Sequence, residues 1–358
     1  MKSLSFLPAM LLCVTALAST SASAAPALDA SARRQVIERA IDEMNKRYVF
    51  PETARRVEQA LRQQQRAGTF DAATDGRDFA ERLTRSLQEV TRDKHVRVRY
   101  SEAPVPVRQQ ADNDLPTAAE LAEWRQQEEK RNFGVEQVMR LPGNIGYLEL
   151  RGFAPAGLAG TALAAAMTLV AHTDALIVDV RRNGGGDPET VALVCSYLFD
   201  HRTHLNSLYQ REGDRTDQYW TQDWVPGERY GQSKPVYVLT SSRTFSGAEE
   251  FSYNLRTQKR ALLVGETTGG GANPGDLRRL SEHFELFVPS GRAINPITKT
   301  NWEGVGVEPH VKTAAPLALA TAESLALKTL IDGEKDAERR AALQSRLAEV
   351  QKTLAAAH

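Results

Sequence analysis

The chain has 358 residues, and its 45 lysines and arginines balance its 45 aspartates and glutamates. A neutral chain has no general electrostatic attraction for nucleic acid or for an anionic membrane. With 41% hydrophobic and 25% charged residues, the composition is that of an ordinary globular protein. Two cysteines exclude a disulfide-rich scaffold and a four-cysteine zinc site. Any indication of function must therefore come from motifs.

The first 24 residues have the order of an export signal. Lys2 supplies a positive charge, residues 6–17 form an apolar run too short to span a bilayer, and small residues precede an expected cleavage after Ala24. A buried N-terminal helix is the alternative. We therefore expect an exported protein, periplasmic or secreted, with no membrane insertion after removal of the signal. Cys195 would then be its single cysteine.

Residues 25–100 have mostly helical periodicity. Apolar side chains recur at helical spacing over residues 32–66, where Pro51 is expected to break the run. Residues 78–87 predict another amphipathic helix, and the alternation over residues 96–100 predicts a short strand. This part of the chain is therefore predicted to be a helical N-terminal domain.

Short apolar runs alternate with helical stretches in the central part of the chain. This alternation predicts an α/β core rather than a sandwich. The tail is predicted to be helical, a closing element exposed to solvent. Strands are expected at residues 145–150, 175–180, 235–240, 261–265 and 284–288, and helices at 159–172, 189–199 and 248–256. The expected domains are a signal peptide (1–24), a helical N-terminal domain (25–100), a linker (101–142), a core (143–315) and a C-terminal helical tail (316–358).

A glycine-rich loop at residues 179–186 (DVRRNGGG) follows an apolar strand and precedes a helix. Consecutive glycines allow backbone N–H groups to face outward and to approach a bound group closely. The loop lacks the Lys-Ser/Thr pair of a P-loop and the G-x-G-x-x-G spacing, so phosphate binding is disfavoured. An oxyanion site is the better functional interpretation, and a plain tight turn is the alternative.

Ser246 lies in a second loop, between a predicted strand and a predicted helix. A serine at such a turn has its hydroxyl at the positive N-terminus of the helix, where the next amide can donate to an oxyanion. This is the principle of the hydrolase nucleophile elbow, although the G-x-S-x-G pattern is absent. Ser246 also lies three residues before Glu249, which is the spacing of a capping box. A purely structural N-cap is therefore an equal alternative.

Four motifs, taken in order, give the chain a family resemblance. Residues 179–186, 244–251 (TFSGAEEF), 265–271 (GETTGGG) and 301–309 (NWEGVGVEP) resemble the tail-specific (C-terminal processing) serine peptidase superfamily. The most similar branch is named for interphotoreceptor retinoid-binding protein and includes the tricorn core protease. The resemblance implies a ββα-spiral core like that of ClpP and crotonase, here a serine peptidase core, preceded by a helical domain.

The resemblance also implies roles for individual residues. Ser246 matches the nucleophile, while His95 and Glu303 match the base and the acid of members with a Ser–His–Glu arrangement. The Ser–Lys arrangement of other members is disfavoured, because the loop at residues 269–273 contains no lysine. The oxyanion donors are matched by Gly247 and by the loop that contains Gly185 and Gly186.

The implied chemistry suits these residue types. A serine hydroxyl is a weak nucleophile that needs a nearby base, which a histidine can supply near neutral pH. A carboxylate can hold the histidine tautomer and stabilise the imidazolium. His310 lies nearer to Glu303 in the sequence than His95 does, and its role is left open. Lys94 stands where the tricorn branch can carry a bridging serine, so a four-residue relay is not expected.

No cofactor is needed for this chemistry, and no metal site is expected. His201 and His204 have an H-x-x-H spacing without the glutamate of a zincin motif. Residues 101–143 are too few for a peptide-binding PDZ module. The sequence thus predicts an exported serine endopeptidase with a peptide or protein substrate and no nucleic-acid partner. The alternatives are a non-catalytic protein that binds a retinoid-like or fatty-acid-like ligand, and an esterase with the same triad.

Overall fold

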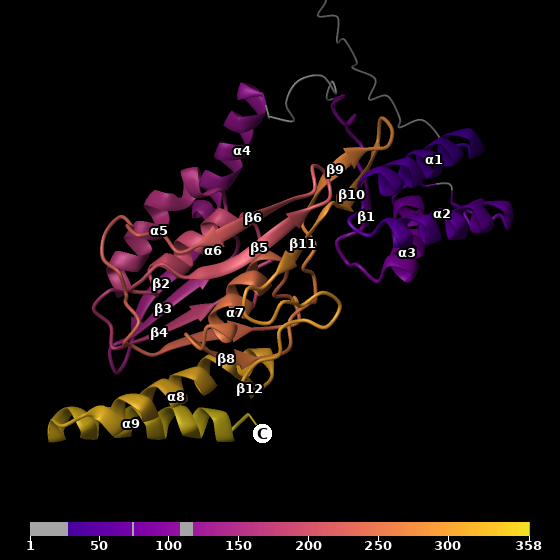
Figure 1. Cartoon of the computed structure of the whole chain (residues 1–358). Coiled ribbons are helices and arrows are strands. Elements are labelled where there is room, and N and C mark those ends of the chain that lie inside the picture. Colours follow the sequence, from indigo (N-terminus) through magenta and orange to yellow (C-terminus); the bar gives the residue numbers. More distant parts are fainter. Residues whose placement is uncertain (1–27, 74, 108–116, 358) are drawn as a thin grey trace, which may run out of the picture.

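A computed structural model of the chain describes residues 28–73, 75–107 and 117–357 (Figure 1). The expected signal peptide at residues 1–24 lies outside the described residues. Within the described ranges, no helix is long and apolar enough to cross a membrane.

The N-terminal part consists of three helices and a strand. Helices α1 (Ala30–Arg47), α2 (Pro51–Arg66) and α3 (Gly76–Thr91) precede strand β1 (Arg97–Tyr100). The predicted break at Pro51 occurs because proline takes the first position of α2, where its missing N–H is not needed. The carboxylates of Asp29 and Asp75 accept hydrogen bonds from backbone amides at the starts of α1 and α3.

A three-stranded sheet joins this N-terminal part to the rest of the chain. Its order is β1-β10-β9, where β9 spans Gly275–Arg279 and β10 spans Phe284–Pro289. Strand β1 pairs antiparallel with β10, with Arg97 opposite Phe287. Apolar side chains of β10 therefore belong to the same buried cluster as those of α1 to α3. This pairing fixes the end of β1 relative to the central core.

The central core is a six-stranded sheet in the order β12-β8-β7-β4-β3-β2. The edge strand β2 is antiparallel to β3. The other five strands run parallel to one another. The α/β class predicted from the sequence is thus confirmed. The strands are β2 (Val135–Leu141), β3 (Ile145–Leu150), β4 (Ala175–Asp179), β7 (Val236–Thr240), β8 (Leu262–Gly265) and β12 (Val311–Lys312).

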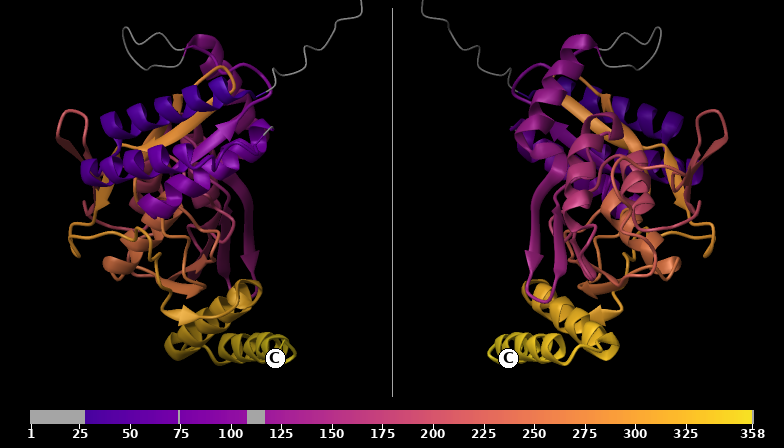
Figure 2. Two further views of the ribbon diagram at one scale, coloured as in Figure 1. Left: turned by 90° about the vertical axis from the view of Figure 1, so that its right-hand side faces the viewer. Right: turned by 90° about the vertical axis from the view of Figure 1, so that its left-hand side faces the viewer.

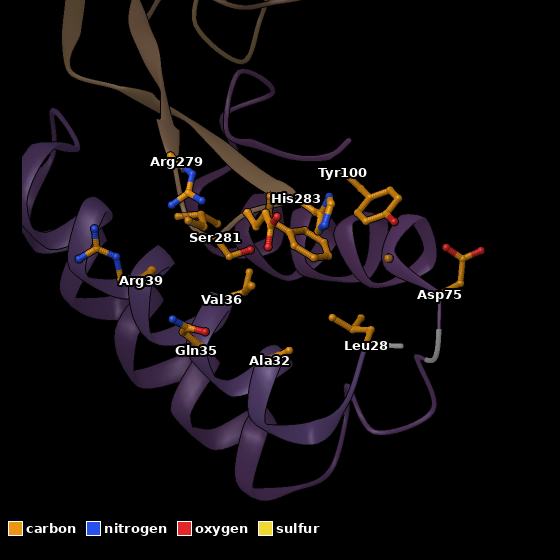
Figure 3. Close-up of a pocket in the computed structure, with 14 residues that line it drawn as sticks. Leu28, Ala32, Gln35, Val36, Arg39, Asp75, Tyr100, Arg279, Ser281 and His283 are labelled. Carbon is orange, nitrogen blue, oxygen red and sulfur yellow. The ribbon is translucent and has the colours of Figure 1, made fainter. Parts of the chain in front are cut away.

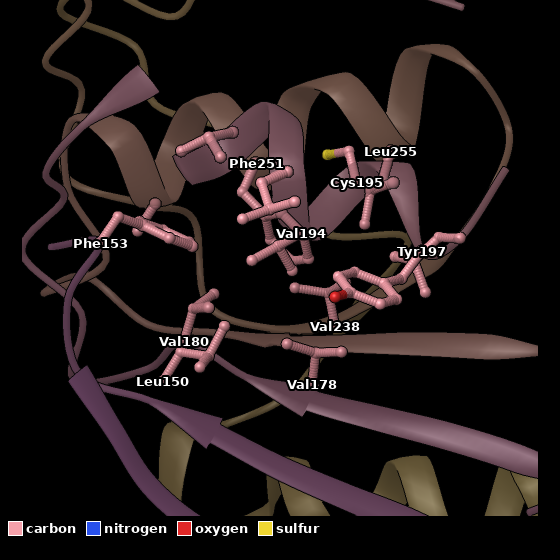
Figure 4. Packing of buried hydrophobic residues seen from close by; sticks show 14 of the residues in the cluster. Leu150, Phe153, Val178, Val180, Val194, Cys195, Tyr197, Val238, Phe251 and Leu255 are labelled. Carbon is pink, nitrogen blue, oxygen red and sulfur yellow. The ribbon is translucent and has the colours of Figure 1, made fainter. Parts of the chain in front are cut away.

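Helices cover both faces of this sheet (Figures 1 and 2). The side chains of α5 (Ala156–Val170), α6 (Pro188–Ser196) and α7 (Gly247–Thr257) pack on one face, as Figure 4 shows for α6 and α7. Helix α8 (Ala318–Gly333) packs on the other face, and α9 (Ala337–Ala355) packs against α8. The C-terminal tail is therefore a pair of helices, the first of which completes the core.

Several elements differ from the sequence-based expectation. The stretch expected as a linker, residues 101–142, contains helix α4 (Ala118–Lys130), a short 3-10 turn and the edge strand β2. Strand β2 is mostly exposed on its outer positions, so it lacks the apolar run by which the buried strands were found. A further sheet in the order β11-β5-β6 was not predicted either. It consists of β5 (His204–Gln210), β6 (Arg215–Trp220) and β11 (Gly291–Ile294).

Candidate active site

Ser246 lies at the turn between β7 and α7, as predicted. Its backbone has φ 54° and ψ −121°, a conformation that is uncommon for any residue except glycine. This strained turn directly precedes Gly247, the first residue of α7. The backbone amides at the start of the helix are therefore directed toward the region of the Ser246 hydroxyl, which is half-buried.

The glycine-rich loop packs directly against this turn. A Cβ atom at Gly185 would lie 2.7 Å from both the Ser246 Cβ and the Gly247 nitrogen, so no other residue fits there. The Gly185 amide already donates to Asn183 Oδ1 at 2.8 Å. The amides of Gly186 and Gly247, by contrast, donate no hydrogen bond within the described part of the chain. The predicted loop and Ser246 are thus brought together, with two amides available for a ligand.

Glu249 connects the Ser246 turn to a second glycine-rich loop, residues 265–271, which follows β8 and is called the glycine loop below. Its Oε2 accepts from the amide of Ser246 at 2.9 Å and from that of Gly271 at 2.8 Å. Its Oε1 accepts from the amide of Gly270 at 2.6 Å and from the Thr268 hydroxyl at 2.5 Å. Burial raises the pKa of Glu249, while these donors oppose the rise. The sequence analysis gave Glu249 only the spacing of a capping box, and its contacts with the glycine loop were missed.

His95 packs beside the Ser246 turn, although it comes from the N-terminal part of the chain. Its ring centroid lies 4.6 Å from that of Phe245 and 5.8 Å from that of Phe287. A Cβ atom at Gly271 would lie 2.6 Å from His95 Cε1, so the glycine loop also covers the imidazole. Both ring nitrogens are buried without a hydrogen-bond partner among the described residues. The structure therefore places His95 next to Phe245, with no hydrogen bond to Ser246.

Two carboxyl groups adjoin His95. Potential ligand atoms of Asp93, His95 and Glu303 all lie within 4.8 Å of one another, and Asp93 Oδ1 is 3.6 Å from His95 Nδ1. Glu303 Oε2 accepts from the Ala272 amide at 2.6 Å, whereas its Oε1 is buried without a partner in the described structure. Burial, and then the charge of Asp93, raise the pKa of Glu303 well above its usual range. The structure thus places Glu303 beside His95.

Asp93 is the second acidic neighbour of His95, and the sequence analysis assigned it no role of its own. Its Oδ2 accepts from Asn273 Nδ2 at 2.9 Å and from the Tyr48 hydroxyl at 3.3 Å, while Oδ1 accepts from the His95 amide at 2.9 Å. The only sequence signal was its position two residues before His95. The nitrogen of His95 and the carboxylate oxygens of Asp93 and Glu303 are atom types that can bind a cation. The Asp93 carboxylate, however, already accepts hydrogen bonds from Asn273, Tyr48 and the His95 amide.

The sequence analysis also discussed His310, His204 and Lys94, which have separate contacts. His310 Nδ1 accepts a hydrogen bond from the Leu263 amide at 3.0 Å, so one nitrogen of its ring is engaged by the backbone of β8. The ring of His204 stacks on Trp220 with centroids 4.4 Å apart. Lys94, by contrast, lies beside the site, because its Nζ donates to the carbonyl of Gly269 at 2.5 Å.

A large cavity of about 630 Å³ lies away from Ser246 (Figure 3). It lies between α1 and the turn that joins β9 to β10, and its wall includes Val36, Arg39, Arg279 and His283. None of the predicted site residues lines it. Volume alone therefore does not locate the candidate active site, which is defined by the convergence of Ser246, His95 and the glycine loops.

The fold is an α/β core in which the turn at Ser246 lies against a glycine-rich loop. The chain matches the model of peptidase family S41 over residues 144–313. It also matches the model described as the N-terminal domain of Peptidase_S41 in eukaryotic IRBP over residues 19–140. The chain belongs to peptidase family S41, within the tail-specific protease superfamily, and the resemblance inferred from the motifs is confirmed.

Individual relatives are distant. Carboxyl-terminal-processing peptidase 2, chloroplastic, from Arabidopsis thaliana is 27% identical over 188 residues, which cover 48% of this chain and 34% of the relative. The chain thus spans about a third of the length of this curated relative. Solved structures at low sequence identity share the fold. They include mature CPAF (13% identity, 89% of this chain and 97% of that chain, TM-score 0.53), the tricorn protease (14%, 89% and 37%, 0.50) and a lipoprotein from Streptococcus agalactiae (12%, 81% and 95%, 0.50).

Proposed function

We propose that this protein is an exported serine endopeptidase that hydrolyses peptide bonds through an acyl-enzyme. Ser246 is the nucleophile, His95 the general base and Glu303 the acid that orients His95. The observation that carries the proposal is the conformation of Ser246, a positive-φ serine at the start of α7, packed against Gly185 and beside the ring contact of Phe245 with His95. Backbone strain of this kind is retained where it serves a site.

In the proposed first step, Ser246 Oγ forms a bond to the scissile carbonyl carbon while His95 accepts the hydroxyl proton. The carbonyl oxygen becomes an oxyanion. As the carbon–nitrogen bond breaks, His95 returns the proton to the leaving amine and an ester with Ser246 remains. Water then attacks that ester in the same manner, with His95 again taking and returning the proton. The step requires His95 and Ser246 to approach more closely than in the free protein, as is common for catalytic hydrogen bonds.

We assign the oxyanion donors to the amides of Gly247 and Gly186. These two amides donate no hydrogen bond within the described structure, and a Cβ atom at Gly247 would lie 3.0 Å from the Gly186 nitrogen. The Gly185 amide is engaged by Asn183. Gly185 then serves by its small size, which lets the loop approach Ser246. Two preorganised amides near a developing negative charge supply a large share of the rate enhancement of a serine hydrolase.

Export and the domain boundaries remain parts of the same proposal. The order of charge, apolar run and small residues in the first 24 residues supports removal of a signal peptide after Ala24. A helical N-terminal part at residues 25–100 would supply His95, and a core at residues 143–315 would supply Ser246 and Glu303. The substrate is a peptide or protein, as the family implies. Binding of an apolar ligand without catalysis is not favoured.

Labelling with a fluorophosphonate probe tests the nucleophile. We expect the wild type to be labelled, Ser246→Ala not to be labelled, and His95→Ala to be labelled far more slowly. Two matched controls remove the same groups from exposed positions, Ser242→Ala and His172→Ala, and should be labelled like the wild type. Equal labelling of Ser246→Ala, or no labelling of folded wild type, would overturn the assignment.

A second comparison separates a peptidase from an esterase. Wild type is given an unfolded protein and a short-chain ester, and Ser246→Ala is run with each to subtract background. Cleavage of the protein that depends on Ser246 supports the proposal. Hydrolysis of the ester alone would instead assign the chain as an esterase.

A further inference from the structure

Three potential metal ligands meet on the side of the site that carries the proposed base. One ligand atom from each of Asp93, His95 and Glu303 lies within 4.8 Å of the other two. Asp93 and His95 come from the loop between α3 and β1, whereas Glu303 comes from the loop between β11 and β12. Because its members are distant in the sequence, no local spacing indicates this group, and the sequence predicted no metal site.

The imidazole of His95 is the member of this group that lacks a partner. Only 10% of its side-chain surface is exposed. Neither ring nitrogen makes a hydrogen bond among the described residues, and Asp93 Oδ1 lies 3.6 Å from Nδ1, beyond hydrogen-bonding distance. A neutral imidazole has one nitrogen with a free lone pair, and that nitrogen is a common metal ligand. Because buried polar groups are nearly always paired, the unpaired ring indicates that a further group binds beside it.

Both carboxylates retain lone pairs for a cation. An ionised carboxylate offers about four lone-pair positions. Asp93 accepts three hydrogen bonds, from the His95 amide and two side chains, and its Oδ1 accepts only the first of them. Glu303 accepts from the Ala272 amide at 2.6 Å, and the Asn273 amide also stabilises its charged form. About one position on Asp93, at Oδ1, and about two on Glu303 are therefore left for a ligand.

Negative charge gathers around this group. Burial raises the pKa of Glu303, and the charges of Asp93 and Glu249 raise it further. The ammonium group of Lys94, which directly precedes His95, donates to a backbone carbonyl instead of pairing with these acids. Carboxylates that are buried side by side are stabilised by a cation between them.

The spacing and the position of the group suit a small ion. Ligands of a tetrahedral zinc ion lie about 2.0–2.2 Å from the metal, which places them roughly 3.4 Å from one another. The separation of 3.6 Å between Asp93 and His95 is already close to that value. Glu303 is half-buried, and its chain neighbours Gly304 and Val305 are exposed, so the group lies just below the surface. An ion of this size needs only the space between its ligands.

We propose that Asp93, His95 and Glu303 form a binding site for a divalent cation of the zinc type, and that the bound ion inhibits the enzyme. The imidazole ligand favours zinc over magnesium and calcium, which prefer oxygen ligands. The inhibition rests on the proposed function of Ser246 and His95, and it deepens that function by naming a regulator of the same site. The binding of zinc does not depend on that function.

Inhibition follows from the roles proposed for these residues. A zinc ion on the ring nitrogen that faces the carboxylates occupies the position through which Glu303 would orient His95. Its positive charge also disfavours the second positive charge of an imidazolium. His95 then accepts the Ser246 proton less readily, so the metal-free protein is the active form. Coordination breaks no covalent bond of the chain, so removal of the ion restores activity.

Titration calorimetry on folded protein without an affinity tag measures zinc binding independently of activity. We expect the wild type to bind zinc and magnesium not to compete at the same concentration. His95→Ala and Glu303→Gln should each bind zinc at least about 10-fold more weakly, since loss of even an outer-shell partner costs that much. Thermal unfolding identifies the folded variants, and either variant alone decides the assignment if the other does not fold.

His172→Ala is the matched control for zinc binding. His172 is exposed and lies 3.3 Å from the carboxylate of Glu228, so this pair offers the same ligand types at the surface. Its removal should leave the zinc affinity at the wild-type value. Absence of zinc binding by the wild type, or binding that is lost in His172→Ala and kept in His95→Ala and Glu303→Gln, would overturn the site.

Fluorophosphonate labelling of the wild type with and without zinc tests the inhibition. We expect saturating zinc to slow the labelling of Ser246 by at least about 10-fold, since general-base catalysis contributes about 10²- to 10⁴-fold. EDTA should restore the original rate, and magnesium should leave it unchanged. A labelling rate that zinc does not lower, or that EDTA does not restore, would overturn the inhibition.

The two measurements separate failure of this inference from failure of the proposed function. Folded protein that is not labelled in the absence of zinc loses the proposed function, and with it the inhibition, while calorimetry still decides the metal site. Protein that is labelled at Ser246 but does not bind zinc through His95 and Glu303 remains a serine hydrolase and loses the metal site.

Discussion

The two halves of the candidate site differ in how completely their polar groups are paired. On the nucleophile side, both oxygens of the Glu249 carboxylate accept two hydrogen bonds each, from Ser246, Thr268, Gly270 and Gly271. On the base side, both nitrogens of His95 and one oxygen of Glu303 are buried without partners in the described structure. The carboxylate on the nucleophile side is therefore fully paired, whereas the polar groups on the base side are not.

This difference indicates how free energy is distributed in the site. Each buried polar atom left unpaired costs about 1–3 kcal/mol, so the base side is held in a conformation that a bound substrate can improve. On the nucleophile side, Glu249 has no unpaired oxygen that a substrate could pair. Moving Ser246 would break the hydrogen bond from its amide to Glu249. We interpret the Ser246 turn as preset and the contacts of His95 as completed when the reacting groups arrive.

The largest expected effect comes from removing the side chain of Ser246 or of His95. Ser246→Ala and His95→Ala should each lower kcat/KM by about 10⁴-fold or more, and the double variant should be no slower than the slower single variant. Residues that act as one unit show this non-additivity. Steady-state kinetics on a peptide substrate measures it, and losses that multiply would show that the two halves act independently.

The next effect separates the two carboxyl groups beside His95. Glu303→Gln should lower kcat/KM by about 10²- to 10⁴-fold with little change in thermal stability, because Glu303 Oε1 has no partner to lose in the described structure. Asp93→Asn should destabilise the fold more, because Tyr48, Asn273 and the His95 amide all donate to Asp93. Activity and thermal unfolding are measured on both variants. The reverse pattern would make Asp93 the orienting acid.

The pH dependence of activity sharpens the same comparison. The pKa of Glu303 is raised by burial and by Asp93, so its carboxylate form, which is needed to face an imidazolium, becomes populated only at a pH well above the usual range of glutamate. We expect kcat/KM of the wild type to rise with pH in that region and the rise to be absent in Glu303→Gln. An identical rise in the variant would exclude Glu303 as its cause.

A smaller effect is expected from loosening the nucleophile side. Glu249→Gln replaces an acceptor oxygen by a donor NH₂ that faces backbone N–H groups, so we expect a loss of about 3 kcal/mol in the free energy of unfolding. The fluorophosphonate labelling rate should fall by about 10²-fold, as for loss of one preorganised donor. Glu308→Gln, at an exposed position, is the control for charge alone. Labelling at the wild-type rate would show that the turn does not depend on Glu249.

The smallest effect concerns Glu250, a buried carboxyl on α7 four residues after Ser246. Burial raises the pKa of Glu250 to about 8, against 4.5 in the unfolded chain. Between these pH values the folded state holds a proton that the unfolded state has lost, so this group's stabilisation is fully present below 4.5 and disappears as the pH rises through 8. The slope is at most about 1.4 kcal/mol per pH unit. Chemical denaturation at several pH values should show a smaller slope in Glu250→Gln, and an unchanged slope would contradict the shift.

Local sequence patterns predicted much of the fold and part of the site. The buried strands β3 and β4 stand out because they are continuous apolar runs between turns, and the break at Pro51 follows from the chemistry of proline. The exposed strands β2, β6 and β9 were missed, because strands with polar outer faces do not produce such runs. Ser246 was found because a serine between a strand and a helix has a recognisable context.

Contacts between distant parts of the chain could not be predicted in this way. Asn273 donates to Asp93 across 180 residues, and strand β1 reaches β10 across a comparable separation. Local periodicity predicts which side of an element is buried, but it does not identify the element that covers that side. The unpaired state of His95 is likewise a property of its surroundings.

The sequence by itself determined the family, the α/β class and the candidate residues Ser246, His95 and Glu303, because short motifs record local backbone and chemical requirements. The tertiary structure decided which groups meet: Glu249 with the glycine loop, and Asp93 with His95. Burial and hydrogen bonding depend on every element that surrounds a group, and these elements come together only when the chain has folded.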